Sequence, residues 1–293
     1  MNQPDIYKSN ALVEAQYRLS VAEQRIILAC IKHVRRDERI TDDELYSVSA
    51  TQIAEISGTS TKQAYRELEK AALRLKQRDV RLLEEPNGQG KKRKVMVTGW
   101  VQTIIYVEDE GRVELRFTKD MLPYLSELST QFTRYSLADV AQMTSGHAIR
   151  LYELLCQWRN LGRREVSIEQ LRDMLQVQDM YPALKDLKRR VIEPAVEQIN
   201  EHSPLWVKYE QRKTGRRVTH LTFTFNEKAL ETPRKPCKEK NQATAARRAR
   251  SGSGAIYGIP MVIIEKNARP GELCEDTALR LLDEAKQGKV GEK

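Results

Sequence analysis

Apolar residues recur at helical spacing in two stretches of the chain, and each stretch is followed by residues that alternate between apolar and polar. In the segment 166–204, Ile168, Leu171 and Leu175 share one face of a first predicted helix. A longer helix follows, and its apolar positions are Leu184, Leu187, Val191, Ala195 and Ile199. Two helices separated by a short break predict a helix-turn-helix.

The ends of these two helices carry their own signals. Ser167 and Gln170 have the spacing of a capping box, which opens the first helix. Residues 176–181 form the break, and Pro182 is expected in the first turn of the second helix, where proline is tolerated. Pro194 lacks the N–H that would bond the carbonyl one turn earlier, so we expect a kink there.

The face opposite the apolar stripe of the second helix is basic. At about 100° per residue, this face presents Pro182, Lys185, Asp186, Arg189 and Glu193, with Arg190 at its edge. Lys188 on the same helix is a further candidate for a DNA contact. A basic outer face on the second helix of such a motif suits the major groove of DNA. The same pattern describes most solvated surface helices, so this segment alone leaves both interpretations open.

The first half of the chain repeats this plan. The pattern Val-Ser-x-x-Gln-aliphatic occurs at 48–53 and again at 166–171, and residues 64–68 align with 183–187 at an offset that differs by one residue. Capping boxes are also predicted at Ser20 with Glu23 and at Ser60 with Gln63. The outer face of the helix that follows Ser60 carries the cations Lys62, Arg66 and Lys70.

After each long helix the period changes to alternation, which predicts strands at 80–83, 95–107 and 113–117 in the first half and at 205–209 and 218–225 in the second. Basic residues surround a glycine turn in each half, namely Lys91, Lys92, Arg93 and Lys94 in the first, and Arg212, Lys213, Arg216 and Arg217 in the second. We interpret these two turns as equivalent hairpin tips that contact phosphates. Repeated landmarks in one order indicate an internal duplication.

The predicted fold class is therefore α+β, with two tandem winged-helix domains and a basic, partly flexible C-terminal tail. We expect an N-terminal domain at 1–130, a C-terminal domain at 131–232 and a linker and tail at 233–293. A helix at 146–162 offers Ile149, Leu151, Leu154, Leu155 and Trp158 as core candidates. Trp158 has an alternative role in stacking on a base, but its spacing favours burial.

Composition narrows the class of protein. The chain has 293 residues, 40% of them hydrophobic, and a net charge of +9. It has no apolar run of about eighteen residues and its N-terminus lacks the apolar core of a signal peptide, so a cytoplasmic location is expected. Basic and acidic residues number 21 and 20 in 1–130, 16 and 13 in 131–232, and 13 and 8 in 233–293. The basic excess therefore lies in the second half and the tail, as phosphate contacts require.

The four cysteines and the tail give weaker signals. Cys30, Cys156, Cys237 and Cys274 contain no Cys-x-x-Cys pair and are expected to be free thiols. From residue 233 the composition becomes linker-like, and a short apolar run at 261–264 and a possible helix at 275–287 follow. A docking element and an unstructured tail are equally open for that region.

The chain resembles the iteron-binding replication initiator proteins of theta-replicating bacterial plasmids. The resemblance rests on motifs between residues 10 and 226: Asn10-Ala11-Leu12, Leu19-Ser20-x-x-Glu23-Gln24-Arg25, Leu122-Pro123-Tyr124-Leu125, Arg150-Leu151-Tyr152-Glu153-Leu154-Leu155, and Leu187-Lys188-x-x-Val191-Ile192-x-Pro194-Ala195 ending in Ile199-Asn200. Each motif is weak, and their joint order is fairly specific.

This resemblance implies that monomers bind direct repeats at a plasmid origin, open a neighbouring A·T-rich region and recruit host replication proteins, including the replicative helicase. It also implies that dimers bind an operator inverted repeat and repress their own gene. In such proteins the long helix of the second domain reads the major groove, which corresponds here to the helix of Lys185 and Arg189. The first domain adds DNA contacts and forms the dimer interface.

Three other functions compete with this one. An enzyme is disfavoured because His33, His147, His202 and His220 form no closely spaced pair for a nicking metal, and residues 88–91 lack the spacing of a phosphate-binding loop. No cofactor or metal is expected. A winged-helix transcriptional repressor without an origin role stays open as the alternative, and a module that binds no DNA is disfavoured by the repeated basic helix and hairpin.

Overall fold

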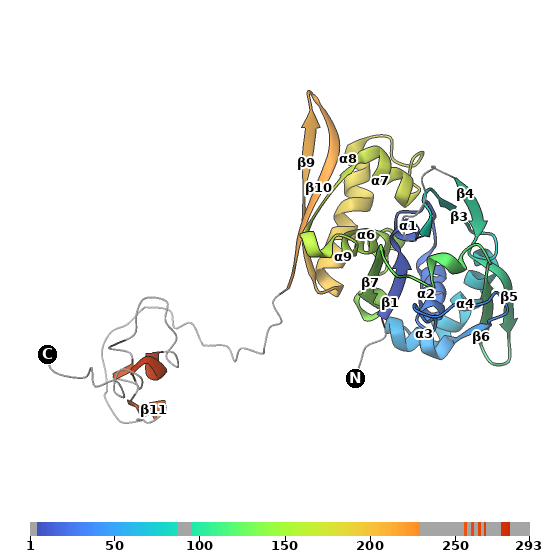
Figure 1. Cartoon of the computed structure of the whole chain (residues 1–293), viewed down its shortest axis with the longest axis horizontal. Helices are drawn as coiled ribbons and strands as arrows, with labels where there is room; N and C mark the ends of the chain where they lie inside the picture. Colours follow the sequence, from blue (N-terminus) through green and yellow to red (C-terminus); the bar gives the residue numbers. More distant parts are fainter. Residues whose placement is uncertain are drawn as a thin grey trace. The chain divides into compact units, whose positions relative to one another are not determined.

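The computed structural model describes residues 5–86 and 95–228, together with short pieces of the tail at 255–256, 259–260, 263–264, 267 and 277–281. The chain divides into two compact units, Met1–Leu230 and Glu231–Lys293. The first unit holds both helix-turn-helix segments (Figure 1). In the described pieces of the tail, the short strands β11 (Ala255–Ile256) and β12 (Ile259–Pro260) pair with each other.

The first half of the large unit begins with a strand and ends with a hairpin. Its elements are β1 (Asp5–Ser9), α1 (Asn10–Val13), α2 (Val21–Ile31), β2 (Tyr46–Ser49), α3 (Ala50–Ser57), α4 (Thr61–Leu75), β3 (Asp79–Leu82), β4 (Met96–Gly99), β5 (Val101–Val107) and β6 (Arg112–Phe117).

The second half follows the same scheme after a connecting region. That region contains the 3-10 turn η2 (Leu122–Tyr124), β7 (Phe132–Ser136), α5 (Ala138–Ala141), α6 (Gly146–Cys156) and the 3-10 turn η3 (Arg159–Leu161). The second motif then comprises β8 (Arg163–Ser167), α7 (Ile168–Leu175), α8 (Leu184–Leu187), the π-helical turn η4 (Lys188–Ile192), α9 (Glu193–His202), β9 (Leu205–Thr214) and β10 (Arg217–Glu227).

Two three-stranded antiparallel sheets have the same order and show the duplication directly. In one sheet the order is β2-β6-β5, and in the other it is β8-β10-β9. The strands β2 and β8 each lead directly into the first helix of a helix-turn-helix. Val48 of β2 pairs with Val113 of β6, and Val166 of β8 pairs with Leu221 of β10. Both halves are therefore winged helices, and the predicted fold class is confirmed.

The topology corrects one part of the sequence interpretation. The hairpin that corresponds to β9–β10 is β5–β6, because both form the sheet with the strand before the first helix. The strands β3 and β4, which flank the basic segment 91–94, form a separate two-stranded sheet instead. The true wing of the first half turns at residues 108–111 and carries Glu108, Asp109 and Glu110. Its tip is therefore acidic, and the predicted equivalence of the two basic hairpins was wrong.

Helix capping follows the sequence closely. Ser20, Ser49 and Ser167 each accept a hydrogen bond from the backbone N–H three residues later, and the Glu or Gln at that position bonds back to the serine N–H. At α4, Ser60 accepts a hydrogen bond from Gln63 N–H, but the Gln63 side chain donates to Glu67 at 3.0 Å, so the predicted capping box is only half formed. These capping residues fix where each helix begins, because they satisfy backbone donors that a helix leaves free.

Helix α6 lies at the centre of the unit and packs against both β7 and α9. Its residues Ile149, Leu151, Leu154 and Leu155 are buried, as predicted. The strand β7, which follows residue 130, pairs with β1 at the start of the chain. Contacts thus cross the expected boundary at residue 130, and the division into 1–130, 131–232 and 233–293 stays a prediction.

Trp158 differs from the prediction of burial, since it is 38% exposed. The reason is that α6 ends at Cys156, two residues earlier than the apolar spacing requires. Trp158 therefore belongs to the turn after the helix, where the guanidinium of Arg164 lies 5.8 Å from the centre of its ring.

The prediction that Pro182 lies in the first turn of the second helix was wrong, and Pro194 is accommodated by a change of helix type. Helix α8 begins at Leu184, so Pro182 lies two residues outside it, and its carbonyl accepts a hydrogen bond from Arg172 at 3.2 Å. Before Pro194 the helix widens into the π-helical turn Lys188–Ile192 and then continues as α9. A wider turn makes room for the proline ring, and helical elements follow one another without a gap from Leu184 to His202.

Candidate nucleic-acid interface

The continuous helix from Leu184 to His202 carries its cations at one end. Lys185, Arg189 and Arg190 are exposed, and Lys188 is half-buried. The same helix carries Glu193, Glu197 and Glu201 in its second half, all of them exposed. The helix is therefore basic toward its N-terminus and acidic toward its C-terminus.

This order of charges opposes the helix dipole. The N-terminal end of a helix carries partial positive charge and favours anions, and the C-terminal end favours cations, at roughly 0.3 to 1 kcal/mol per exposed charge. Cations at the N-terminal end of this helix therefore weaken it slightly. Such a placement is expected where the charges serve an external ligand rather than the helix itself.

Two of these cations have neighbours in the free protein. Arg189 forms an ion pair with Asp186 at 3.1 Å, and the side chains are 61% and 44% exposed. An exposed pair of this kind contributes about 0 to 1 kcal/mol, so a phosphate or a guanine edge can replace the carboxylate at little cost. The ammonium of Lys188 lies 6.0 Å from the centre of the Tyr209 ring, which orients it toward the sheet.

The wing of the second motif is a long hairpin with a two-residue turn. Gly215 has a φ of 62°, a left-handed conformation that glycine adopts without steric cost, and the turn joins Thr214 to Arg217. The four predicted cations, Arg212, Lys213, Arg216 and Arg217, are all exposed. Arg212 donates to Nδ1 of His220 at 2.9 Å and forms an ion pair with Glu165 at 3.3 Å.

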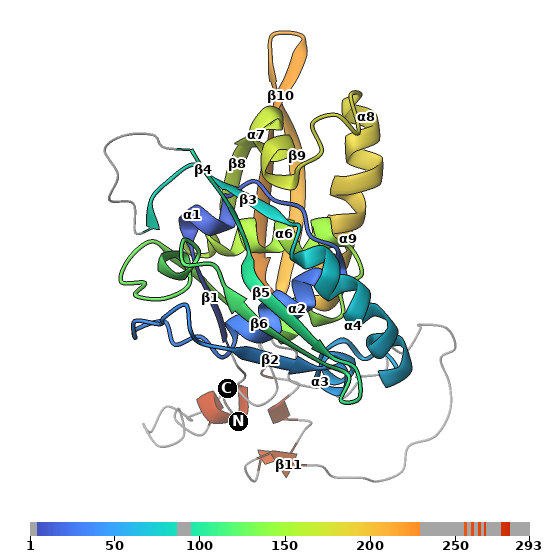
Figure 2. The ribbon, with the colours of Figure 1, turned by 90° about the vertical axis from the view of Figure 1, so that its right-hand side faces the viewer.

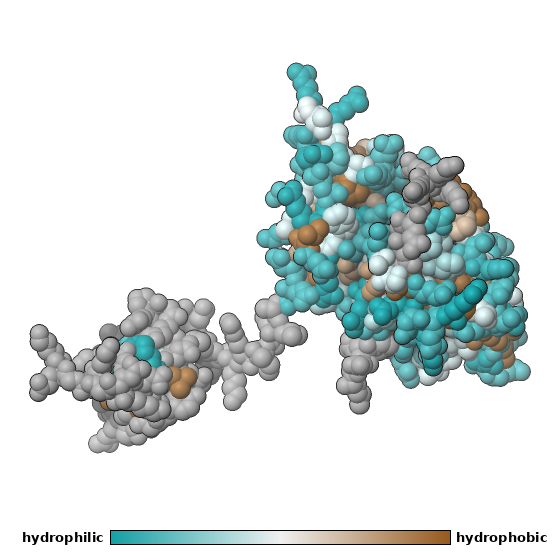
Figure 3. All heavy atoms as spheres, in the orientation of Figure 1, coloured by the Kyte–Doolittle hydropathy of each residue, from teal (hydrophilic) through white to brown (hydrophobic). Residues whose placement is uncertain are grey.

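The hairpin tip and the start of α8 lie at the same end of the molecule (Figures 1 and 2). Hydrophilic side chains cover the projecting end of the hairpin, as Figure 3 shows. A basic helix beside a projecting basic hairpin is the arrangement in which the helix enters a groove and the hairpin follows the backbone of a duplex.

The first motif presents the equivalent helix, α4. Its cations Lys62, Arg66 and Lys70 are exposed. In Figure 2 the helices α4 and α8 lie toward the same side of the large unit. The predicted cations Lys91, Lys92, Arg93 and Lys94 lie outside the described residues.

The acidic wing of the first motif is held against α4. The hydroxyl of Tyr65 donates to the carbonyl of Glu108 at 2.5 Å, and Gly111 lies directly under the Tyr65 ring. Phosphates repel the carboxylates at this tip, so the wing β5–β6, as the described residues show it, is not a basic hairpin. The second winged helix is therefore the better candidate for the main DNA contact.

No sequence pattern identified the exposed cation Arg18 as a candidate. Arg18, in the loop before α2, donates to the sulfur of Met180 at 3.0 Å, in the turn that precedes α8. Burial is the main cause that lowers the pKa of His147, and the positive charge of Arg18 lowers it further. Arg18 is 162 residues from Met180 in sequence, so no local pattern connects it with the helix-turn-helix.

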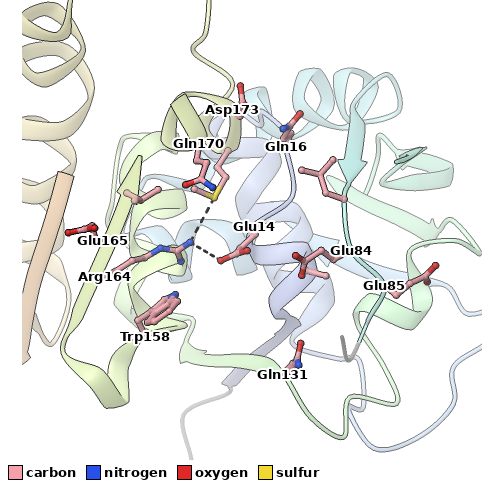
Figure 4. A pocket seen from close by; sticks show the side chains of 14 residues that line it. Glu14, Gln16, Glu84, Glu85, Gln131, Trp158, Arg164, Glu165, Gln170 and Asp173 are labelled. Atoms are coloured by element: carbon pink, nitrogen blue, oxygen red, sulfur yellow. Dashed lines mark hydrogen bonds and ion pairs between the residues drawn. The ribbon is translucent and has the colours of Figure 1, made fainter. Parts of the chain in front are cut away.

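A cavity of about 840 Å³ in the large unit has the opposite character (Figure 4). Its lining includes Trp158 and Arg164 together with the acidic residues Glu14, Glu84, Glu85, Glu165 and Asp173. Arg164 already has partners for its guanidinium, because it donates to Glu14 at 2.8 Å and to the carbonyl of Leu154 at 2.7 Å. An acidic lining repels phosphates, so this cavity is a poor candidate for a nucleic-acid contact.

A buried polar network fixes α6 to the N-terminal segment. The carboxylate of Glu153 accepts hydrogen bonds from Lys8 at 2.6 Å, Arg150 at 2.7 Å, Tyr135 at 2.5 Å and Tyr17 at 3.2 Å. Burial acts to raise the pKa of Glu153, but the charges of Lys8 and Arg150 outweigh it and lower that pKa to about 2. Glu153 is therefore ionised across the physiological pH range.

Within the described parts of the chain, no group of three or more His, Cys, Asp or Glu side chains is arranged to hold a metal ion. Nor does any helix in those parts combine the length and the apolar character needed to cross a membrane.

Two winged helices in one chain, each with exposed cations on its second helix, define a tandem winged-helix protein. Residues 5–156 match the family described as Initiator Replication protein, WH1, and residues 167–225 match the family described as Initiator Rep protein, WH2. The chain therefore belongs to the initiator replication proteins, and the resemblance found in its sequence is confirmed.

Individual relatives agree with this family. A replication initiation protein of Escherichia coli is 26% identical over 238 residues, which cover 76% of this chain and 70% of the relative. The PI protein of Escherichia coli is 21% identical over 245 residues, covering 74% of this chain and 80% of the relative. A probable replication protein rep of Bifidobacterium longum (strain NCC 2705) is 34% identical over 124 residues, 40% of each chain.

Among solved structures, the crystal structure of Pi initiator protein in complex with iteron DNA superimposes with a TM-score of 0.64. The two chains are 20% identical, and the match covers 78% of this chain and 99% of the other. This similarity shows that the two proteins share the tandem winged-helix fold.

Proposed function

We propose that this protein is a sequence-specific DNA-binding initiator that recognises direct repeats, or iterons, at a plasmid origin. The observation that carries the proposal is the helix Leu184–His202, whose exposed cations lie at one end of the molecule beside the basic tip of the β9–β10 hairpin. The family supports a role in replication initiation, and a relative of the same fold was crystallised with iteron DNA.

The roles of individual cations follow from their position on these elements. Lys185 and Arg189, with Arg190 beside them, contact base edges and the adjacent phosphates, because they lie on the helix that enters the groove. Lys188, whose ammonium lies against the Tyr209 ring in the free protein, adds a contact from the same helix. Arg212, Lys213, Arg216 and Arg217 contact the backbone from the hairpin, which positions the protein without reading sequence. Lys62, Arg66 and Lys70 add contacts from the first winged helix.

We further infer that binding to several repeats opens a neighbouring A·T-rich region and recruits host replication proteins, including the replicative helicase. A dimer that binds an inverted repeat would repress the gene of the protein itself. Strand β5 supports self-association, because it is an edge strand and Ile105 on it is 42% exposed.

The first experiment is footprinting of the purified chain on the DNA that flanks its gene, because it gives site sequence, spacing and orientation together. Direct repeats about two helical turns apart beside an A·T-rich tract support initiation. A single palindrome without direct repeats would instead support the alternative, a winged-helix repressor without an origin role.

The second experiment tests the assignment of the helix on the footprinted site. Arg189→Ala should lose roughly 1 to 3 kcal/mol of binding free energy on the cognate repeat and relax the preference for it over a scrambled repeat. Lys119→Ala is the matched control, because this exposed cation lies outside both second helices and both hairpins. Equal affinity of Arg189→Ala and the unaltered chain for the repeat would remove Arg189 from the interface.

A further inference from the structure

The acidic half of the long helix borders an open groove that the DNA-binding role does not use. The groove has a volume of about 500 Å³ and lies between α9 and the edge strand β9. Its surface is formed mainly by Val196, Trp206 and Tyr209, and carboxylates line one side. Trp206 is 50% exposed, which is unusual for the largest apolar side chain of a sheet edge.

The two walls of the groove are held rigidly together. The side-chain amide of Asn200 donates to the carbonyl of Val207 at 2.9 Å, and its oxygen accepts a hydrogen bond from Val207 N–H at 2.6 Å. At one end, the hydroxyl of Tyr209 donates to Glu193 at 3.0 Å. Burial is the main cause that raises the pKa of Tyr209 to about 12, and the carboxylate of Glu193 also contributes. The hydroxyl therefore stays protonated and can donate this hydrogen bond. The groove is thus preformed in the free protein.

The carboxylates have a regular spacing. Glu193, Glu197 and Glu201 follow one another at four-residue intervals, which places successive groups about 6 Å apart along the helix axis. In an extended peptide, every second side chain is about 6.6 to 6.8 Å from the next. Cations at alternate positions of an extended segment therefore face consecutive carboxylates.

These carboxylates also repel DNA, which we propose binds the basic N-terminal half of the same helix. Among the described residues, Glu197 has no ion-pair partner, and Glu201 is paired only with His202 at 3.6 Å. A phosphate backbone in the groove would be repelled, whereas the face of Trp206 attracts a guanidinium by cation–π interaction.

We propose that this groove is a docking site for a basic segment of a partner protein, bound in extended form with arginine or lysine at every second position. Its cations pair with Glu197 and Glu201, and one of them stacks on Trp206. Because the basic and acidic halves of the helix are consecutive, a partner can occupy the groove while the cations of Lys185 and Arg189 hold DNA. The docking itself requires no DNA, so it stands independently of the proposed function.

The test uses the full chain and a fluorescein-labelled peptide with arginine at every second position and valine between. Fluorescence anisotropy should show salt-dependent binding to the unaltered chain, and Glu197→Gln with Glu201→Gln should weaken it by about tenfold, since two charge pairs are lost. The matched control is Glu55→Gln with Glu210→Gln, which removes two exposed carboxylates outside the groove and should leave binding unchanged.

A second readout locates the peptide. Trp206 is one of three tryptophans, of which Trp100 is fully buried, so peptide binding should shift the intrinsic emission, and Trp206→Phe should abolish that shift while retaining most of the binding. The proposal is overturned if the unaltered chain fails to bind the peptide. That result is expected if the basic tail of the chain itself fills the groove. Equal weakening by the groove pair and the control pair would also overturn it. Iteron binding by the same variants is measured separately, so failure of one role does not imply failure of the other.

Discussion

The buried carboxylate of Glu153 offers the sharpest test of how the unit is held together. Substitution Glu153→Gln keeps the shape of the side chain and removes its charge. The NH2 group that replaces one carboxylate oxygen donates hydrogen bonds and cannot accept them, so at least one donor among Lys8, Arg150, Tyr135 and Tyr17 loses its partner. Lys8 and Arg150 are each 2% exposed and would become two buried cations without a counter-charge.

The size of the effect follows from this geometry. Breaking a buried ion pair by removing one partner costs about 3 to 5 kcal/mol, because the remaining charge keeps its desolvation penalty. For a folded unit of this size, 1 kcal/mol corresponds to about 2 to 4 °C in the midpoint of thermal unfolding. Glu153→Gln should therefore lower the midpoint by on the order of 6 to 20 °C.

The assay is thermal unfolding of the full chain followed by circular dichroism, with Glu227→Gln as the matched control. Glu227 forms an ion pair with Arg159 at 2.8 Å, but its side chain is 65% exposed. An exposed pair contributes about 0 to 1 kcal/mol, so the control should shift the midpoint by only a few degrees at most. Similar shifts in the two variants would refute the assignment of Glu153 as the centre of a buried network.

The same residue predicts a pH dependence. The pKa of Glu153 is lowered from 4.5 to about 2 in the folded state, so the unfolded chain takes up its proton first as the pH falls. The stability that this carboxylate contributes is fully present above the unfolded value and is lost as the pH falls from about 4.5 toward 2. In this window the stability of the unaltered chain should fall more steeply than that of Glu153→Gln, and parallel curves would contradict the shift.

Three further outcomes are expected. Arg216→Ala, at the hairpin tip, should weaken binding to all duplexes alike and reduce the slope of log affinity against log salt by about 0.9, as titrations with cognate and scrambled DNA would show. Gly111→Ala should destabilise the first winged helix by about 1 to 3 kcal/mol in urea unfolding, because φ is +55° and a Cβ would lie 2.6 Å from the Tyr65 ring. Burial raises the pKa of Cys30 and raises that of Cys156 to about 12, so iodoacetamide should label neither thiol before unfolding, as peptide mass spectrometry would detect.

The elements themselves could be predicted because their signals are local. The serines that cap α2, α3 and α7 lie three residues before their Gln or Glu partners, and the structure shows the hydrogen bonds at those positions. The strands β3, β6 and β10 were likewise located by alternation within two residues, but 95–107 is interrupted at Trp100 and β9 continues to Thr214, five residues beyond its predicted end. The strands β2 and β8 were not predicted. Local spacing is sufficient here since capping and alternation depend only on nearby residues.

Strand pairing was the part that sequence could not decide. Residues 80–83 and 95–107 looked like one hairpin that continued into the winged-helix sheet, but Met96–Gly99 pairs with β3 and Val101–Val107 pairs with β6. A strand pattern states which side chains face the core and not which neighbour supplies the hydrogen bonds. The basic segment 91–94 was therefore assigned to the wrong hairpin, and the acidic tip at 108–111 was missed.

For the candidate interface, the sequence located the cations and the structure placed them relative to one another. Lys185, Arg189 and the hairpin arginines were found from periodicity and turn composition. Two features depend on packing between segments that lie far apart in the chain. The helix continues past Pro194, and Arg18 contacts Met180.

The amino-acid sequence by itself determined the duplicated plan, the capped helices and the basic character of two outer helix faces, because these properties repeat every two to four residues. The tertiary structure alone decided which hairpin is the wing of the first half, that Trp158 faces a cavity, and that the acidic half of the long helix lines a groove with Trp206. The physical reason is that hydrogen-bonded strand neighbours, burial and cavity lining arise from contacts between distant residues, and chain spacing carries no record of those contacts.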